Sequence, residues 1–191
     1  MEQSEALELY RRTGAFLEGH FRLSSGLHSS GYLQSALVLQ HPADAAALGA
    51  GIAGRVKNLK PSVVLSPALG GLIIGHEVAR ALGVRAIFAE RAGTPSLGLR
   101  RGFTLAPSDR VLVVEDVLTT GKSTQETIGV ARDAGAAVVG AAAIVDRSGG
   151  TIDFGVPAHT LIQLDLPTYD PGACPLCAQG IAVVKPGSRP D

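Results

Sequence analysis

The chain has 191 residues, of which 46% are hydrophobic and 18% are charged, and its formal net charge at pH 7 is zero. This length predicts one domain with a sizeable core and room for a small subdomain. The balanced charge excludes the basic surplus of a nucleic-acid-binding domain, and no hydrophobic run approaches the roughly 18 residues of a transmembrane helix. The acidic start lacks the features of a signal peptide, so we expect a cytoplasmic protein without nucleic-acid or membrane partners.

The hydrophobic pattern predicts helices and strands that alternate along the chain. A first helix, capped by Ser4 and ended by Gly14, should precede short strands between residues 15 and 39. An alanine-rich helix is expected over 43–59. Further strands are expected at 63–66, 85–91, 111–116 and 138–145, with helices ending near 82 and spanning 125–134. This order predicts an α/β fold with a mostly parallel central sheet flanked by helices.

No internal repeat or long linker divides the chain, so we expect a single domain over residues 1–191. Its core should span about 42–150. The first 40 residues and residues 152–191 should pack together as a small cap subdomain over the carboxyl edge of the sheet.

The expected strand at 111–116 ends in Glu115 and Asp116, and a loop with Thr119, Gly121 and Lys122 follows directly. A strand–loop–helix junction points backbone N–H groups at a phosphate, aided by the positive end of the helix dipole. Carboxylates repel that phosphate but accept hydrogen bonds from the vicinal hydroxyls of a ribose. The pattern predicts a pocket for a phosphorylated ribose, where ligands of open α/β sheets bind.

Two other interpretations of this loop can be compared with the sequence. A P-loop needs a glycine five residues before Gly121, and Asp116 stands there, so that motif is excluded. An ordinary helix start, with Ser123 or Thr124 as the N-cap, is compatible with the phosphate site and is expected alongside it.

The strand and loop over residues 111–123 resemble the 5-phosphoribosyl-1-diphosphate (PRPP) binding motif of the type I phosphoribosyltransferases. The resemblance implies that family's fold, with the acidic pair on the ribose hydroxyls and the loop around the 5′-phosphate. The residues that it assigns to PRPP are Arg91, Glu115, Asp116, Val117, Leu118, Thr119, Thr120, Gly121, Lys122 and Ser123.

A second strand-to-helix junction, Ser66–Gly71, contains two glycines that permit close approach of an anion. The resemblance makes this the pyrophosphate loop, often with a non-proline cis peptide, and assigns Ala68, Leu69, Gly70 and Gly71 to it. A plain turn is the alternative. Many pyrimidine-branch relatives carry a lysine here, which implies that Arg91 supplies the missing charge.

The Gly- and Pro-rich segment 92–99 is flanked by Arg91, Arg100 and Arg101 and is expected to be a mobile lid. The resemblance implies closure over PRPP across a homodimer interface, with catalytic roles for these three arginines and for Asp116. A solvated edge is the alternative. We expect Mg²⁺ as cofactor, bound through substrate oxygens and waters and not directly by the protein.

The stretch Phe21–Ser30 resembles a signature of orotate phosphoribosyltransferases. Arg147 follows a buried strand, and its planar guanidinium suits a carboxylate; a salt bridge with Asp146 or Asp165 is the alternative. The resemblance assigns orotate binding to Ser24, Tyr32, Thr119 and Arg147.

The activity that this resemblance implies is transfer of the phosphoribosyl group from PRPP to orotate, giving orotidine 5′-monophosphate and diphosphate in pyrimidine synthesis. A purine or uracil phosphoribosyltransferase and a non-catalytic PRPP-sensing regulator are the alternatives.

The only cysteines, Cys174 and Cys177, have a spacing that fits half a zinc site or a redox pair. No second pair exists, and the nearest histidine in sequence is His159. We therefore expect a tight loop with two reduced thiols, although a dimer could bring two pairs together. His28 is expected to have no catalytic role. The tail from Cys174 to 187 is similar to that of a subgroup of the resembled family.

Overall fold

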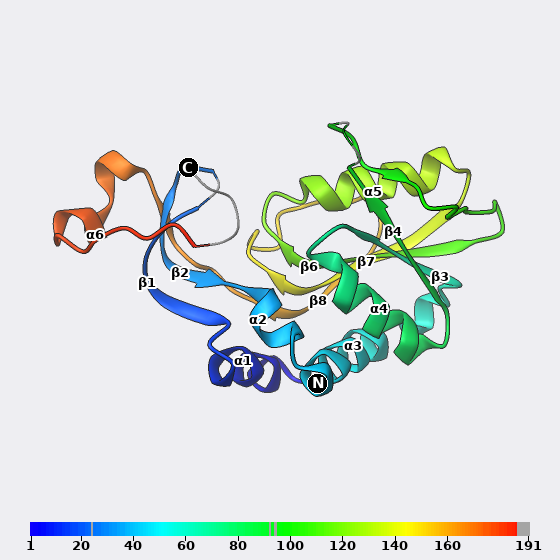
Figure 1. Cartoon of the computed structure of the whole chain (residues 1–191), viewed down its shortest axis with the longest axis horizontal. Coiled ribbons are helices and arrows are strands. Elements are labelled where there is room, and N and C mark those ends of the chain that lie inside the picture. The colour runs from blue at the N-terminus through cyan, green and yellow to red at the C-terminus, as the bar shows by residue number, and fades with distance from the viewer. Residues whose placement is uncertain (24, 92, 94, 187–191) are drawn as a thin grey trace.

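The computed structural model describes residues 1–23, 25–91, 93 and 95–186. Its larger lobe is a six-stranded sheet in the order β5-β4-β3-β6-β7-β8 (Figure 1). All neighbouring strands are parallel except β5, which is antiparallel to β4 at one edge. The strands are β3 (Val63–Pro67), β4 (Arg85–Glu90), β5 (Gly98–Leu99), β6 (Arg110–Leu118), β7 (Ala137–Asp146) and β8 (Ala158–Gln163).

Helices cover both faces of this sheet (Figure 1). On one face lie α3 (Pro42–Val56) and α4 (Gly71–Leu82), with a short 3-10 helix η1 (Lys57–Leu59) after α3; on the other lies α5 (Lys122–Asp133). Alternate residues of the central strands point to opposite faces. Leu112 therefore packs with the α3–α4 side and Val113 with the α5 side. The expected α/β class with a mostly parallel sheet is confirmed.

A smaller lobe is built from both ends of the chain. It is a three-stranded antiparallel sheet in the order β1-β2-β9, whose β1–β2 pairing contains a bulge. Val184, which follows β9 in the chain, forms an isolated parallel bridge with Phe21 of β1. The elements in and around this lobe are α1 (Gln3–Arg12), β1 (Phe16–Arg22), β2 (His28–Leu33), α2 (Ser35–Leu39), β9 (Thr168–Tyr169), the 3-10 helix η2 (Pro171–Ala173) and α6 (Pro175–Ala178).

The expected boundary between core and cap is wrong at two elements. Strand β8, expected in the cap, pairs with β7 in the central sheet. Helix α1 buries Tyr10 in the main core, in the same cluster as Leu48 of α3. Both elements contribute apolar side chains to the core cluster on the α3–α4 face of the sheet, so they belong with the core.

The start of the first helix also differs from the expectation. Helix α1 begins one residue before Ser4, and Glu2 is its N-cap. The backbone N–H of Glu2 donates to Glu5 Oε2 at 2.7 Å, which completes a capping box. A glutamate pair therefore replaces the expected serine cap.

Among the described residues, no helix has both the length and the apolar character needed to cross a membrane.

Candidate functional site

The sequence motifs meet where the strand order of the sheet reverses. Strand β3 leads through α4 to β4 on one side, and β6 leads through α5 to β7 on the other. The loops that leave β3 and β6 diverge at this point, and in open α/β sheets ligands bind in such a crevice. The loops touch, because a Cβ built on Gly70 would lie 2.6 Å from Asp116 Oδ1. Glycine at position 70 allows this close approach.

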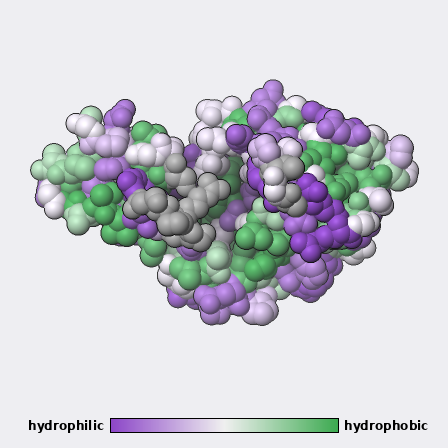
Figure 2. Space-filling model, turned by 45° about the horizontal axis from the view of Figure 1, so that its top comes forward, coloured by the Kyte–Doolittle hydropathy of each residue, from purple (hydrophilic) through white to green (hydrophobic). Residues whose placement is uncertain are grey.

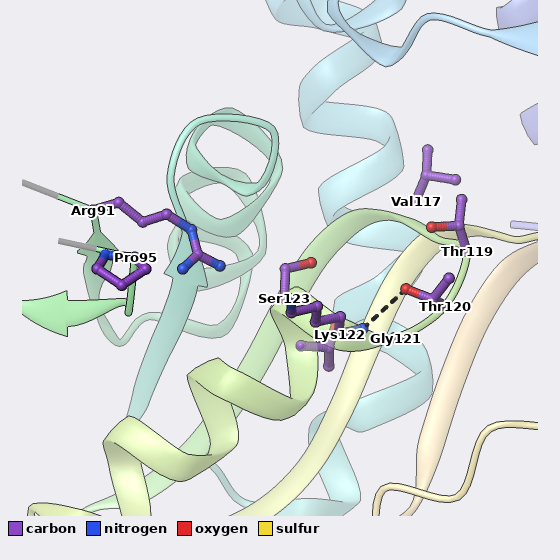
Figure 3. Close-up of a pocket in the computed structure, with 9 residues that line it drawn as sticks. Arg91, Pro95, Val117, Thr119, Thr120, Gly121, Lys122 and Ser123 are labelled. Carbon is purple, nitrogen blue, oxygen red and sulfur yellow. Dashed lines mark hydrogen bonds between the residues drawn. The ribbon is translucent and has the colours of Figure 1, made fainter. Parts of the chain in front are cut away.

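A cavity of about 470 Å³ opens beside this crevice (Figure 3). In the space-filling view the surface is hollowed between the two lobes (Figure 2). Figure 3 shows Arg91 on one side of the cavity and the start of α5 on the other. The lining residues are Arg91, Pro95, Val117, Thr119, Thr120, Gly121, Lys122, Ser123 and Thr124. Seven of them, Val117 and residues 119–124, come from the end of β6, the loop after it and the start of α5, which together form the main wall.

Helix α5 has no side-chain cap at the end that faces this cavity. Its N-cap is Gly121 in the left-handed conformation, φ 72°, so the expected Ser123 or Thr124 cap is wrong. The reason is that Ser123 Oγ donates instead to Glu115 Oε2 at 2.8 Å. The first helical bond runs from Gln125 N to Gly121 O. The earlier N–H groups thus have no intrahelical partner. That of Lys122 donates to Thr120 Oγ1 at 3.4 Å, a long bond that an anion could replace.

The two carboxyl groups lie near the end of β6, which continues two residues beyond Asp116 to Leu118, and they have different environments. Glu115 is buried, and burial together with the neighbouring charge of Asp116 raises the pKa of its carboxyl to about 8. Asp116 is half-buried and accepts a hydrogen bond at Oδ1 from the N–H of Val117 at 2.9 Å. Asp116 is therefore the better placed of the two to act as a charged acceptor for a ligand.

Arg147, just after β7, has no carboxylate partner within the described part of the chain. Its Nε is buried without a hydrogen-bond partner, and burial lowers the pKa of its guanidinium. The salt bridges that the sequence left open are not formed, since Asp146 Oδ1 instead accepts from the N–H and the hydroxyl of Ser148 at 2.7 and 2.6 Å.

Tyr32 of β2 lies within reach of two charges of this region. Burial first, and then the charge of Asp116, raise the pKa of its phenol, while the charge of Arg147 lowers it. The smaller lobe thus brings Tyr32 into the electrostatic field of the site. Ser24, the other residue expected from this lobe, lies outside the described residues.

The three arginines expected in the lid lie in different settings. Arg91 lines the cavity and pairs with Glu126 of α5. Arg100 has a buried Nε that finds no hydrogen-bond partner among the residues that the structure describes. Arg101 bonds both oxygens of Glu90, at 2.7 and 3.0 Å, and its guanidinium lies 5.8 Å from the ring centre of Phe88. In this conformation Arg91 is therefore the one of the three that faces the cavity.

The expected pyrophosphate loop carries a cis peptide between Ala68 and Leu69. The Leu69 side chain is 82% exposed. Gly71 begins α4, and a Cβ there would lie 2.9 Å from the carbonyl oxygen of Val114. The loop is therefore packed closely against the end of β6.

Comparisons with known proteins agree with this geometry. Residues 36–154 match the family model of the phosphoribosyl transferase domain. A curated orotate phosphoribosyltransferase from Pelotomaculum thermopropionicum is 50% identical over 189 residues, which cover 99% of each chain. One from Thermus thermophilus is 51% identical over 177 residues, covering 93% of this chain and 97% of the relative. The chain belongs to the orotate phosphoribosyltransferase family.

Solved structures of this family have the same architecture. The orotate phosphoribosyltransferase of Mycobacterium tuberculosis in complex with Fe(III) dicitrate matches with a TM-score of 0.69 and 26% identity, over 85% of this chain and 96% of that one. The same enzyme in complex with PRPP matches with a TM-score of 0.64 and 27% identity, over the same shares of the two chains. The resemblance inferred from the motifs is therefore confirmed.

Two residues at or beside the cavity received no site role from the sequence. Pro95 lines the cavity, and Glu126 of α5 pairs with Arg91, which lines it. Glu126 could have been suspected, because it lies one turn along α5 from Ser123 and so on the same face of the helix. The sequence marks Pro95 only as part of the Gly- and Pro-rich segment 92–99, and nothing in the pattern predicts its contact with the cavity.

Proposed function

We propose that this chain transfers the phosphoribosyl group of PRPP to orotate, forming orotidine 5′-monophosphate and diphosphate in pyrimidine biosynthesis. The observation that carries the proposal is the uncapped start of α5, which opens onto the cavity beside the Asp116 carboxylate. A phosphate and a ribose diol need donors and acceptors in this arrangement. The family relation supplies the reaction that uses both.

PRPP would lie with its 5′-phosphate on the loop Thr119–Ser123, where N–H groups without intrahelical partners, hydroxyls and Lys122 favour an anion. Asp116 would accept a hydrogen bond from a ribose hydroxyl. The diphosphate would extend towards Gly70 and Gly71, with Arg91 supplying positive charge. Breaking the C1–O bond builds positive charge on the ribose and negative charge on the diphosphate, so fixed cations near the leaving group lower the barrier.

Orotate would place its carboxylate against Arg147. The guanidinium has donors to spare, because its buried Nε has no partner in the ligand-free protein. Tyr32 and Thr119 would border the base. A ring nitrogen of orotate then gives up its proton to solvent or to the leaving diphosphate and forms the new bond to C1, as the C1–O bond breaks and diphosphate leaves with the bonding electrons.

Mg²⁺ is part of this proposal as a cation carried by the substrate. Glu115 is a poor metal ligand, because its raised pKa favours the protonated form and Ser123 occupies one oxygen. Asp116 is assigned to the ribose in this proposal, so Mg²⁺ would be held by diphosphate oxygens and waters and not directly by the protein. Bound in this way, Mg²⁺ would neutralise charge that develops on the diphosphate.

We further propose that the chain acts as a cytoplasmic homodimer whose lids complete each other's sites. Arg101 is paired with Glu90 and does not line the cavity of its own chain, and exposed Leu69 and Ile73 offer an apolar surface beside the pyrophosphate loop. Arg100 and Arg101 would then serve the site of the partner subunit.

The experiment that tests the proposed function is a diphosphate-release assay with PRPP and Mg²⁺. Orotate, uracil, adenine and hypoxanthine are supplied in parallel. Release that requires orotate supports the proposal, whereas equal or faster release with uracil or a purine base contradicts it. Binding of PRPP without release with any base would indicate a non-catalytic sensor.

A further inference from the structure

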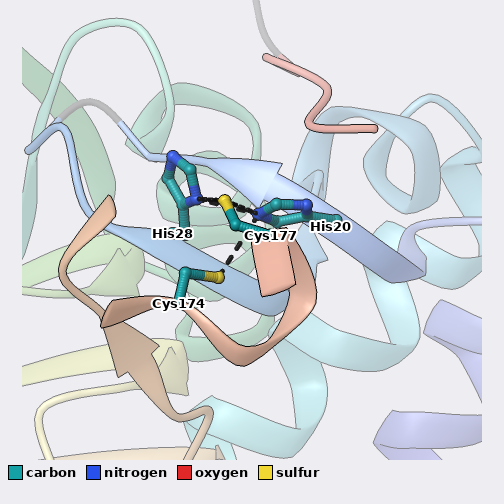
Figure 4. A group of neighbouring side chains, drawn as sticks. All are labelled: His20, His28, Cys174 and Cys177. Atoms are coloured by element: carbon teal, nitrogen blue, oxygen red, sulfur yellow. Dashed lines mark hydrogen bonds between the residues drawn. The ribbon is translucent and has the colours of Figure 1, made fainter. Parts of the chain in front are cut away.

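Four side chains that could hold a metal ion converge between the β1–β2 hairpin and the C-terminal segment (Figure 4). Their ligand atoms all lie within 4.8 Å of one another, and three of the four residues are buried. We call them the Cys2His2 cluster: His20 of β1, His28 of β2, Cys174 before α6 and Cys177 within α6.

The spacing within the Cys2His2 cluster is close to that of a tetrahedral zinc site. With Zn–N near 2.0–2.1 Å and Zn–S near 2.3 Å, neighbouring ligands lie about 3.6 Å apart for N–S pairs and about 3.3 Å for N–N pairs. Here Cys174 Sγ and Cys177 Sγ lie 3.5 and 3.8 Å from His20 Nε2, and Cys177 Sγ lies 3.4 Å from His28 Nδ1. The two ring nitrogens are 2.8 Å apart, a hydrogen-bond distance. Metal binding therefore requires the His28 proton to lie on Nε2, so that Nδ1 offers a lone pair, and a small ring rotation to widen the gap.

The surroundings fix which nitrogen of His20 faces the cluster. Its Nδ1 lies 2.7 Å from the carbonyl oxygen of Ile181, which can only accept a hydrogen bond. Nδ1 therefore carries the proton, and the lone pair of Nε2 points at the other three ligands. Metal-binding histidines commonly donate their second N–H to such a partner, which sets the tautomer and the ring orientation.

We propose that the Cys2His2 cluster binds one structural Zn²⁺ ion. Two thiols and two imidazoles in tetrahedral spacing match the preference of zinc, and a hard cation such as Mg²⁺ would select oxygen ligands. Binding replaces the two thiol protons, so that two thiolates and the cation sum to zero charge at a largely buried site. With all four positions filled by the protein, the ion has no place for a substrate.

The C-terminal segment needs such a link because it has almost no core of its own. Between residues 171 and 186, Cys174 is the one buried residue, and Ile181, Val183 and Val184 are exposed. Its backbone is tied to β1 by hydrogen bonds in which Arg22 N donates to Val184 O and Val184 N donates to His20 O, both at 2.8 Å. Small units with little apolar burial commonly rely on a metal or a disulfide.

The proposed zinc site also shares a strand with Tyr32, the residue of this lobe that is proposed to border the base. His28 and Tyr32 lie on the same strand, β2, which pairs with β1 on one side and β9 on the other. Loss of the ion should therefore loosen both the C-terminal segment and the strand that presents Tyr32.

The test uses the full chain, produced in zinc-supplemented medium and purified without a metal-affinity column. We expect inductively coupled plasma mass spectrometry to find one zinc ion per chain, and Cys177→Ser to lose it. His41→Ala is the matched control, since His41 is exposed and lies outside the cluster; it should retain the ion. A chelator should lower the melting temperature of the wild type, and Zn²⁺ but not Mg²⁺ should restore it.

Cobalt provides a second readout that does not depend on how well a variant folds. Co²⁺ added to the chelated wild type should give the visible bands of a tetrahedral site and a thiolate charge-transfer band. Only trace zinc in folded wild-type protein, with no such spectrum, would overturn the proposal. So would a mass two hydrogens below that of the dithiol, which would show a disulfide in place of the metal site.

Discussion

Replacing Arg147 with alanine separates a substrate contact from a structural one, because the two roles predict different changes in stability. Its Nε is buried without a partner, a situation that costs roughly 1–3 kcal/mol. The backbone N–H of Arg147, which donates to Leu118 O at 2.8 Å, survives the substitution. The melting temperature of Arg147→Ala should therefore stay constant or rise.

Catalysis should change in the opposite direction. Removing one partner of a buried charge pair costs about 2–5 kcal/mol, and the half-buried position of Arg147 favours the lower part, about 2–3 kcal/mol. At about 1.4 kcal/mol per factor of ten, the kcat/KM for orotate should fall roughly 30- to 150-fold. PRPP affinity should persist, because the phosphoribosyl contacts come from the β6–α5 loop. Arg147→Lys should restore activity only in part, since lysine keeps the charge and loses the planar fork.

Steady-state kinetics with varied orotate, calorimetric titration with PRPP and thermal unfolding provide the three readouts. Arg80→Ala, which removes an exposed arginine of α4 paired with Glu77, is the control and should change little in any of them. An Arg147→Ala protein that melts several degrees lower while using orotate normally would refute the reasoning. Arg147 would then stabilise the fold, and another group would bind the carboxylate.

Four further outcomes follow from the site. Asp116→Asn should weaken PRPP binding in calorimetry by roughly 10- to 150-fold, for the loss of a charge-assisted bond of about 1.5–3 kcal/mol, with little change in melting temperature; undiminished binding would remove the ribose assignment. Gly70→Ala should lower activity by displacing the Asp116 carboxylate, which would lie 2.6 Å from the new Cβ, whereas Gly54→Ala, with no atom within 4 Å, should not; equal activity in both would count against the contact. Because the folded protein holds a proton on Glu115 that the unfolded chain releases, stability in urea should fall as pH rises from about 4.5 to about 8, and Glu115→Gln should flatten this slope; a slope unchanged in the variant would assign it to other groups. Arg91→Ala should lower kcat more than it raises the KM for orotate, if Arg91 acts on the leaving diphosphate; a change confined to the orotate KM would place it at the base.

The sequence predicted the larger lobe well because its signals are local. The apolar run at the start of β6 and the carboxylates at its end are contiguous, and a parallel strand buried on both faces reads as such a run. The residues of the loop from β6 to α5 are also contiguous in the sequence. The cap of that helix was missed because Ser123 bonds to Glu115, eight residues earlier, and a side chain already engaged there does not cap its own helix.

The features that the sequence could not predict depend on pairing between distant segments. Strand β9 reaches β2 across most of the chain, so Cys174 meets His20 and not His159, the nearest histidine in sequence. The setting of Arg101 depends on a shorter-range pairing, because Glu90 and Phe88 of β4 lie 11 and 13 residues before it. A short pattern carries no information about such contacts until the fold brings the segments together.

The central claim is that the β6–α5 loop binds the phosphoribosyl group while Arg147 binds the base. The most direct test is a crystal structure of the protein with orotidine 5′-monophosphate. We predict the phosphate within hydrogen-bond distance of the N–H groups of Thr119–Ser123, a ribose hydroxyl on Asp116, and the orotate carboxylate against the guanidinium of Arg147. A nucleotide whose phosphate lies on the Ser66–Gly71 loop, or whose carboxylate lies away from Arg147, would contradict the account.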